Sequence, residues 1–248
     1  MKVSIITVVY NRVEAIADCV ASVRSQTWPD LEYIVVNGAS TDGTSQVLDG
    51  LRDRIDIYVN EPDKGIYDAL NKAMALATGD VIGLMHSDDV FQDERVVADV
   101  AARFADPSVR LVYGDLEYVA KADLGRVIRR WVSCSFTSGL LRQGWMPPHP
   151  TLFVHREAYR AVGGYDTSYR IAADYDFVLR YFRRFGQQSR HVPRVLVRMR
   201  VGGASNRSLS NVMRKTSEDY RILRVNGVGG VAGLLWKNLS KLGQFLAR

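Results

Sequence analysis

The sequence predicts an α/β fold with a mostly parallel sheet flanked by helices. Over the first 120 residues, short apolar runs of strand length alternate with amphipathic helical stretches, as they do in βαβ units. The chain has 248 residues, of which 47% are hydrophobic and 24% charged, an ordinary globular composition that provides for one large core or two smaller ones.

Five apolar runs of the first half are predicted as strands. They span residues 3–9, 31–36, 55–59, 81–85 and 110–113. Between them, the apolar residues of 13–23 and 66–77 recur at i, i+3, i+4 and i+7, which places them on one face of a helix. Gly79 stands where a C-terminal cap of the second of these helices is expected.

After residue 120 the alternation is less regular. The predicted elements are an edge strand at 124–132, a loop at 133–151, a short strand at 152–154, helices at 156–162 and 174–185, and a late strand at 192–197. The tail is predicted as two helices, at 205–226 and 228–247. No repeat or low-complexity tract marks a linker between independent domains.

The net charge of +6 is unevenly distributed. Residues 1–120 carry −10 and residues 121–248 carry +16. Two interpretations stay open: the basic residues only solubilise helix faces, or they attract an anionic partner such as a phospholipid, a lipid-linked phosphate or a nucleic acid.

The cysteine count and the absence of a leader pattern predict a cytoplasmic setting. Only Cys19 and Cys134 occur, without a Cys-x-x-Cys pair, so neither a disulfide framework nor a structural zinc site is expected. The apolar start of the chain runs into Tyr10 without a small-residue cleavage site, and no stretch reaches the ~18 apolar residues of a membrane span.

Two adjacent carboxylates, Asp88 and Asp89, follow the predicted strand at 81–85. Open α/β sheets bind ligands at the carboxyl edge of their strands. An acidic pair on a loop is usually just solvated, but at this edge its oxygens suit a divalent cation that bridges two phosphates.

Three further polar segments follow strands at the same predicted edge. They are Tyr10-Asn11-Arg12, the loop from Asn37 to Thr44, and the segment from Asp63 to Asp68. The Asn37 amide can pair with a base edge, and Lys64 can neutralise a phosphate. Taken alone, the second segment is also explained as a Gly/Ser/Thr-rich loop capped by Asp42 or Thr44.

These segments, in this order and spacing, resemble the blocks of family 2 glycosyltransferases with the GT-A fold. The matching blocks of the first half are Ser4 to Arg12, Asn37 to Thr44, Asp63 to Lys72, Gly79 to Gly83, and Ser87-Asp88-Asp89. Later blocks, His149 to Phe153, Gly163 to Asp166 and Ala173 to Arg180, are similar to those of the bacterial cell-surface polysaccharide and glycolipid members. The resemblance covers residues 1–200.

The resemblance implies an inverting transfer of a sugar from a UDP- or GDP-sugar, with Mg²⁺ or Mn²⁺ on the acidic motif. By position, Asp89 would bind the metal, Asp88 would contact the ribose or assist the metal, and Asp174 would be the general base, although it also suits a plain helix cap. The remaining implied donor-binding residues are Tyr10, Asn11, Arg12, Asn37, Asp42, Lys64 and Asp68. His149 and Arg180 are candidates for acceptor or diphosphate binding.

Two positions depart from the family pattern. Asn37 stands where an Asp usually contacts the nucleobase, which leaves UDP versus GDP open. The acidic block begins with His86 rather than Asp, and this histidine either contacts the donor or metal or is a hydrogen-bonded structural residue. No Gln-x-x-Arg-Trp motif of processive synthases is found near the C-terminus, so a single transfer is expected.

By the resemblance, residues 1–200 are the catalytic domain, with a nucleotide-sugar half at 1–120 and an acceptor half at 121–200. Residues 201–248 form a basic tail whose apolar stripe from Val231 to Leu246 lies beside Lys237, Lys241 and Arg248. Such a stripe either lies in the headgroups of an anionic membrane or packs on the domain or a second subunit. A lipid-linked or saccharide acceptor at the inner face of the plasma membrane is therefore expected.

Two other functions make different demands on the sequence. A sugar nucleotidyltransferase would place a Gly-rich, basic phosphate loop after the first strand, where Tyr10-Asn11-Arg12 stands. A nucleic-acid-binding module using residues 121–248 would tolerate mutation of Asp89 or Asp174. Neither is the preferred interpretation, and no nucleic-acid partner is expected.

Overall fold

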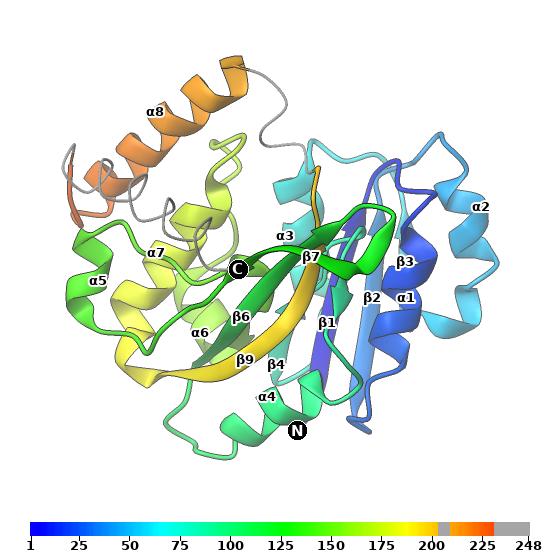
Figure 1. Ribbon diagram of the computed structural model, residues 1–248, viewed down its shortest axis with the longest axis horizontal. Helices are drawn as coiled ribbons and strands as arrows, with labels where there is room; N and C mark the ends of the chain where they lie inside the picture. The colour runs from blue at the N-terminus through cyan, green and yellow to red at the C-terminus, as the bar shows by residue number, and fades with distance from the viewer. Residues whose placement is uncertain (203–208, 231–248) are drawn as a thin grey trace.

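The computed structural model describes residues 1–202 and 209–230, which build one curled sheet with helices packed around it (Figure 1). The strands are β1 (Val3–Val9), β2 (Leu31–Asn37), β3 (Ile57–Asn60), β4 (Val81–Leu84), β5 (Val90–Phe91), β6 (Leu111–Ala120), β7 (Asp123–Trp131), β8 (Phe153–His155) and β9 (Ser189–Arg200). The helices are α1 (Ile16–Arg24), α2 (Thr44–Asp49), α3 (Ile66–Leu76), α4 (Val96–Arg103), α5 (Ser138–Arg142), α6 (Arg156–Val162), α7 (Ala173–Phe185) and α8 (Leu209–Val225).

The strand order is β3-β2-β1-β4-β8-β6-β9-β5, and β7 pairs with β6 outside this path. β1 to β4 are parallel to one another, and β6 and β9 run the same way because β8 is antiparallel to both β4 and β6. β5 and β7 are antiparallel to their neighbours. The predicted α/β class with a mostly parallel sheet is confirmed, and the loops that follow β1, β2, β3 and β4 meet at one edge.

Both faces of the central strands are buried, which explains their continuous apolar runs. In β1, Ile6 and Val8 belong to the cluster that packs against α3 and α7, while Ile5 and Val9 belong to the cluster that packs against α1 and α4. A strand with one exposed face would alternate apolar and polar residues instead.

The first four predicted strands lie within two residues of the ends of β1, β2, β3 and β4, and the predicted strands at 124–132 and 152–154 lie within one residue of β7 and β8. β6 and β9 are longer than predicted, and β5 has no counterpart among the predicted strands. β6 continues to Ala120 and β9 spans Ser189–Arg200, because the two strands pair with each other along nearly their whole lengths. This pairing keeps the polar residues at their ends in the sheet. β3 begins at Ile57 because residues Arg52–Arg54 form a 3₁₀ turn before it.

Two predictions on helix ends need correction or fall outside the structure. α3 ends at Leu76 and its C-terminal cap is Ala77 in extended conformation, so Gly79 is not the cap. Gly79 is required for another reason: a Cβ there would lie 2.6 Å from the Ser4 backbone nitrogen.

Of the two tail helices, α8 matches the first, and the predicted helix at 228–247 lies almost wholly outside the described residues. Within the described part of the chain, no helix is long and apolar enough to span a membrane.

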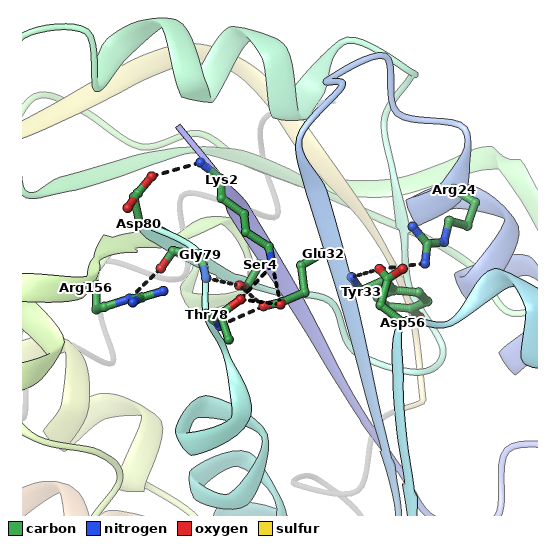
Figure 2. Close-up of polar contacts among 10 residues, drawn as sticks. All are labelled: Lys2, Ser4, Arg24, Glu32, Tyr33, Asp56, Thr78, Gly79, Asp80 and Arg156. Carbon is green, nitrogen blue, oxygen red and sulfur yellow. Dashed lines mark hydrogen bonds and ion pairs between the residues drawn. The ribbon is translucent and has the colours of Figure 1, made fainter.

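Glu32 is the hub of a buried polar cluster at the amino ends of the strands, which Figure 2 shows. Its carboxylate accepts hydrogen bonds from Lys2 Nζ at 2.7 Å, from Ser4 Oγ at 2.5 Å and from the Thr78 backbone N–H at 2.8 Å. Burial alone would raise the pKa of Glu32, but these hydrogen bonds outweigh it and lower the pKa to about 2. The cluster joins β1, β2 and the loop that precedes β4.

We expect Glu32→Gln to lower the free energy of unfolding by about 2–3 kcal/mol near pH 7, because it leaves Lys2 and the hydroxyl donors without their charged acceptor. The folded pKa lies below the ordinary value of 4.5, so the stabilisation is full above that pH and is lost as the pH falls towards 2. Urea unfolding of both proteins at neutral and at acid pH measures this.

The matched control is Glu14→Gln, because Glu14 pairs with Lys121 at 2.7 Å while both side chains are exposed. This control should leave the unfolding midpoint unchanged. An equal deficit of Glu32→Gln at neutral and acid pH would contradict the assignment of a lowered pKa to Glu32.

Candidate functional site

A cavity of about 1100 Å³ opens at the sheet edge where β1, β2 and β4 end. Its walls come from the loops after these strands, from the start of α3, and from residues near α7, the end of β9 and α8. The residues that line it and carry polar side chains are Tyr10, Asn11, Arg12, Asp63, Tyr67, His86, Ser87, Asp88, His149, Tyr165, Arg170, Asp174, Arg200 and Arg214.

The loops after β1 and β2 are bonded to each other and form one wall. The Asn11 backbone N–H donates to Ser40 Oγ at 2.9 Å, and Asn11 Oδ1 accepts from the Thr41 N–H at 2.8 Å. Asn11 has a φ of +53°, a conformation that asparagine tolerates better than most residues. Tyr10, Asn11 and Arg12 line the cavity from this wall, and their role in binding the donor stays a prediction.

The acidic pair after β4 is divided between the cavity and the interior. Asp88 lines the cavity, and its Oδ2 lies 3.4 Å from Arg12 Nε. Asp89 is only 1% exposed, its Oδ1 accepts from the Arg200 N–H at 3.1 Å, and its buried Oδ2 has no hydrogen-bond partner among the described residues. Burial first, and then the charge of Asp88, raise the pKa of Asp89 well above its ordinary value.

Arg200 is a cavity residue that the sequence did not reveal. It ends β9, its Nη1 donates to the Asp88 carbonyl at 2.8 Å, and its Nη2 donates to Asp18 on α1 at 2.6 Å. The sequence indicates Arg200 only weakly as a site residue. The predicted strand ends at residue 197, and the sequence does not show that β9 pairs in parallel with β6, which brings Arg200 to the edge of the sheet where the cavity lies.

Asp174 stands in the first turn of α7 and faces the cavity beside two histidines. His149 Nδ1 lies 3.3 Å from Asp174 Oδ2, and His149 Nε2 lies 3.0 Å from His86 Nε2. If His149 donates from Nδ1 to the carboxylate, its Nε2 must accept from His86, so this assignment leaves both rings neutral. Burial, and then the neighbouring His149, lower the pKa of His86 to about 4, and burial also lowers that of His149.

The start of α7 is fixed from α8. Glu218 accepts backbone hydrogen bonds from Arg170 at 3.0 Å and from Ile171 and Ala172 at 2.9 Å. The N-cap of α7 is Ala172, so Asp174 does not serve as the helix cap. Its carboxylate projects into the cavity from a helix end that is held by a residue 44 positions later in the sequence.

Besides the buried Asp89, five predicted site residues do not line the cavity. Asn37 is buried, donating to Ser45 and Tyr58 and accepting from Ser40. Asp42 accepts from Val13 and Thr44, and Asp68 accepts from the Lys64 N–H while the Lys64 side chain is exposed. Arg180 binds Asp176 and the carbonyls of Val162 and Gly164. Their roles in binding donor or acceptor stay predictions.

Asp63, Arg170 and Arg214 line the cavity but were not among the predicted site residues. Asp63 belongs to the segment from Asp63 to Asp68, in which the sequence favours the basic neighbour Lys64 as the residue that binds a phosphate. Arg170 and Arg214 come from a loop and from α8, whose positions depend on tertiary packing rather than on strand order.

Within residues 1–202 and 209–230, no group of three or more His, Cys, Asp or Glu side chains is arranged to hold a metal ion. The two carboxylates after β4 are the available anionic oxygen donors at that end of the cavity. A cation there would therefore depend on further oxygen ligands supplied by a substrate or by water.

The sequence matches the model of the family described as glycosyl transferase family 2 over residues 4–163. A Mycobacterium tuberculosis protein named PGL/p-HBAD biosynthesis glycosyltransferase is 30% identical over 217 residues, covering 82% of this chain and 78% of that protein.

Two solved structures share the fold. TarS 1-349 of S. aureus in complex with UDP-GlcNAc has a TM-score of 0.71 and 19% identity; the match covers 92% of this chain but only 66% of that one. The mannosyltransferase PcManGT of Pyrobaculum calidifontis, in complex with GDP-Man and Mn²⁺, has a TM-score of 0.61 and 18% identity, covering 100% of this chain and 76% of that one.

We expect the His86 ring to stay neutral well below its ordinary pKa of 6.5 and to titrate near pH 4, since charging it would bury a cation beside His149. Because the folded pKa is lowered, stability from this neutral pair is full above about pH 6.5 and is lost as the pH falls towards 4. Imidazole chemical shifts followed by NMR across this range measure the pKa directly.

In His86→Asn the loss of stability over the same pH interval should be smaller, because one buried ring no longer has to be charged. A His86 titration near its ordinary value would show that the ring is solvated and is not held by His149.

Proposed function

The chain belongs to glycosyl transferase family 2 and is a glycosyltransferase of bacterial cell-surface type, and on that premise we propose that it transfers a single sugar, with inversion, from a nucleoside diphosphate sugar to an acceptor hydroxyl. The observation that carries this proposal is one cavity lined both by Asp88, from the acidic pair after β4, and by Asp174 from the first turn of α7. The sugar nucleotidyltransferase and nucleic-acid alternatives have no comparable support.

The charge of the cavity suits a diphosphate. Four of its lining residues are Arg12, Arg170, Arg200 and Arg214. Arginine presents several N–H donors in a fixed plane and stays charged at all physiological pH values, so it binds phosphate oxygens well. Arg12 is already paired with Asp88, and a diphosphate would compete with that carboxylate for the guanidinium.

The acidic pair fits a divalent cation. Asp89 has a buried carboxylate oxygen with no hydrogen-bond partner among the described residues, and a cation would offset the cost of keeping that carboxylate charged. Asp89 would hold Mg²⁺ or Mn²⁺, with Asp88 assisting or contacting the ribose, and donor phosphates completing the coordination. When bound, the ion supplies positive charge that stabilises the departing diphosphate.

Asp174 would act as the general base. Its Oδ2 faces His149 and its Oδ1 accepts from the Tyr175 N–H at 2.8 Å, which fixes the plane of the carboxylate. A carboxylate oxygen has more than one lone pair, so each oxygen retains the capacity to accept the proton of an attacking hydroxyl. Attack from the side opposite the leaving diphosphate gives inversion at the anomeric carbon.

A lipid-linked or saccharide acceptor would enter from the side of α7 and α8. The name of the M. tuberculosis relative, which refers to PGL/p-HBAD biosynthesis, supports a cell-surface product. The basic, apolar tail at 231–248 would bring the protein to the inner face of an anionic membrane, but that stripe lies outside the described residues.

We expect Asp174→Asn to bind donor and metal normally and to lose at least the ~10²–10⁴-fold in kcat that a positioned base contributes. Transfer from UDP- and GDP-sugars, assayed with equilibrium donor binding, separates the two effects. Asp106→Asn is a suitable control, because Asp106 is an exposed carboxylate that accepts from Ser108 and does not line the cavity. Near wild-type turnover would return Asp174 to a structural role.

We expect Asp89→Asn to abolish the stabilisation of the protein by Mn²⁺ plus UDP or GDP while leaving the fold intact, since an amide oxygen can still accept from the Arg200 N–H. Without metal the variant should be at least as stable as the wild type, because it no longer buries a carboxylate with an unpaired oxygen. Thermal unfolding with and without Mn²⁺ and nucleotide tests both points. Donor binding that is indifferent to chelator and to this substitution would exclude Asp89 as a metal ligand.

A further inference from the structure

Gly38 has no side chain, and this absence lets the Asp63 carboxylate lie beside Tyr10 in the cavity wall. A Cβ placed on Gly38 would lie 2.3 Å from Asp63 Oδ2 and 3.5 Å from Tyr10 Cδ2. The Asp63 carboxylate, from the loop after β3, thus occupies the space that a side chain at position 38 would fill after β2. All three residues line the cavity.

The two oxygens of Asp63 have different surroundings. Oδ1 accepts the Gly65 N–H at 2.8 Å, which fixes the carboxylate at the start of α3. In the described part of the chain, Oδ2 receives no hydrogen bond from protein. The side chain is therefore held in one orientation with one acceptor atom available to a ligand.

Tyr10 supplies an aromatic face beside this acceptor. It is 58% exposed, an unusual state for a large aromatic side chain, and it lies on the cavity wall next to Gly38. A nucleobase stacked on such a ring presents its edge sideways, towards hydrogen-bonding groups in its own plane. A tyrosine ring and a carboxylate oxygen thus lie next to each other in the cavity wall, and these are the two groups that a stacked and hydrogen-bonded base requires.

We propose that Asp63 selects the nucleobase of the donor by accepting a ring N–H through Oδ2 while the base stacks on Tyr10. This proposal rests on the proposed transfer from a nucleoside diphosphate sugar and specifies which nucleotides that site takes. Uracil and guanine carry a ring N–H on the pairing edge. Cytosine and adenine carry a ring nitrogen lone pair there, which would face the carboxylate oxygen without a proton between them.

Asn37 is less suited to this task. It is fully buried, and its amide donates to Ser45 Oγ at 2.8 Å and accepts from Ser40 Oγ at 2.6 Å. These bonds shape the loop after β2, so Asn37 holds Gly38 in place while Asp63 provides the contact to the base.

The test compares the affinities of UDP with CDP, and of GDP with ADP, by calorimetry in the presence of Mn²⁺. In at least one pair, the wild type should bind the nucleotide whose base carries the ring N–H, UDP or GDP, ~10-fold or more tightly than CDP or ADP. This factor is the scale of a hydrogen bond to a charged group. In Asp63→Asn the amide oxygen must take the Gly65 N–H, because an NH₂ cannot accept it. The NH₂ then replaces Oδ2, and the preference should fall by ~10-fold or reverse towards CDP or ADP.

Two further variants control for loss of charge and loss of stacking. Glu61→Gln removes an acid two positions away that pairs with Lys72 at 2.8 Å and does not line the cavity. It should therefore leave the UDP/CDP and GDP/ADP affinity ratios unchanged. Tyr10→Ala should weaken all four nucleotides together. A folded Asp63→Asn protein with the wild-type ratios would overturn the assignment of Asp63.

The failure of this proposal is distinguishable from failure of the transferase proposal. If the wild type binds a nucleoside diphosphate but does not discriminate within the pairs, only the role of Asp63 is lost. If the wild type binds none of the four nucleotides, the nucleotide-sugar site itself is lost, and the role of Asp63 with it.

Discussion

The buried guanidinium of Arg200 links three parts of the molecule that are far apart in sequence. It lies at the end of β9, donates to the Asp88 carbonyl and to Asp18 on α1, and its backbone N–H donates to Asp89. Without Arg200 the acidic loop would keep the ion pair of Asp88 with Arg12 and the hydrogen bond of the Asp89 N–H to the His86 carbonyl, but the Asp89 carboxylate would lose its backbone donor. Because a strand from the second half of the chain supplies that donor and the guanidinium, the acidic loop has its full set of contacts only in the complete sheet.

Charged residues from both halves of the sequence line the cavity. Asp63 and Asp88 come from the acidic first half, while Arg170, Arg200 and Arg214 come from the basic second half. The first half also supplies Arg12 and the second half Asp174, so each half brings both signs to one pocket, with most of the arginines coming from the basic half. The proposed ligand, a diphosphate with a metal ion, would require groups of both signs.

The fold and one wall of the cavity can be predicted from the sequence, because both depend on patterns of neighbouring residues in the chain. A buried parallel strand is a continuous apolar run, and the residues after it lie at the edge of the sheet, which predicted the places of Tyr10, Asn11, Arg12 and Asp88. What sequence could not provide was side-chain direction within a loop. The Asn37 side chain points inward and forms hydrogen bonds with Ser40 and Ser45 of the loop that follows it. In the segment after β3, Asp63 lines the cavity and the adjacent Lys64 does not. Arg200 and Glu218 act through contacts that depend on strand pairing and helix packing, for which a single sequence carries no signal.

The place of β8 in the sheet constrains the order in which this protein can be assembled during synthesis. β4 pairs on one side with β1 and on the other with β8, and β8 in turn joins it to β6 and β9. Asp89 and the Arg200 N–H that binds it are 111 residues apart, so the acidic loop leaves the ribosome long before its partner exists. A nascent chain that ends before β9 lacks Met199, Arg200 and Arg214, so the pocket around the acidic motif is completed late, when the last strands enter the sheet.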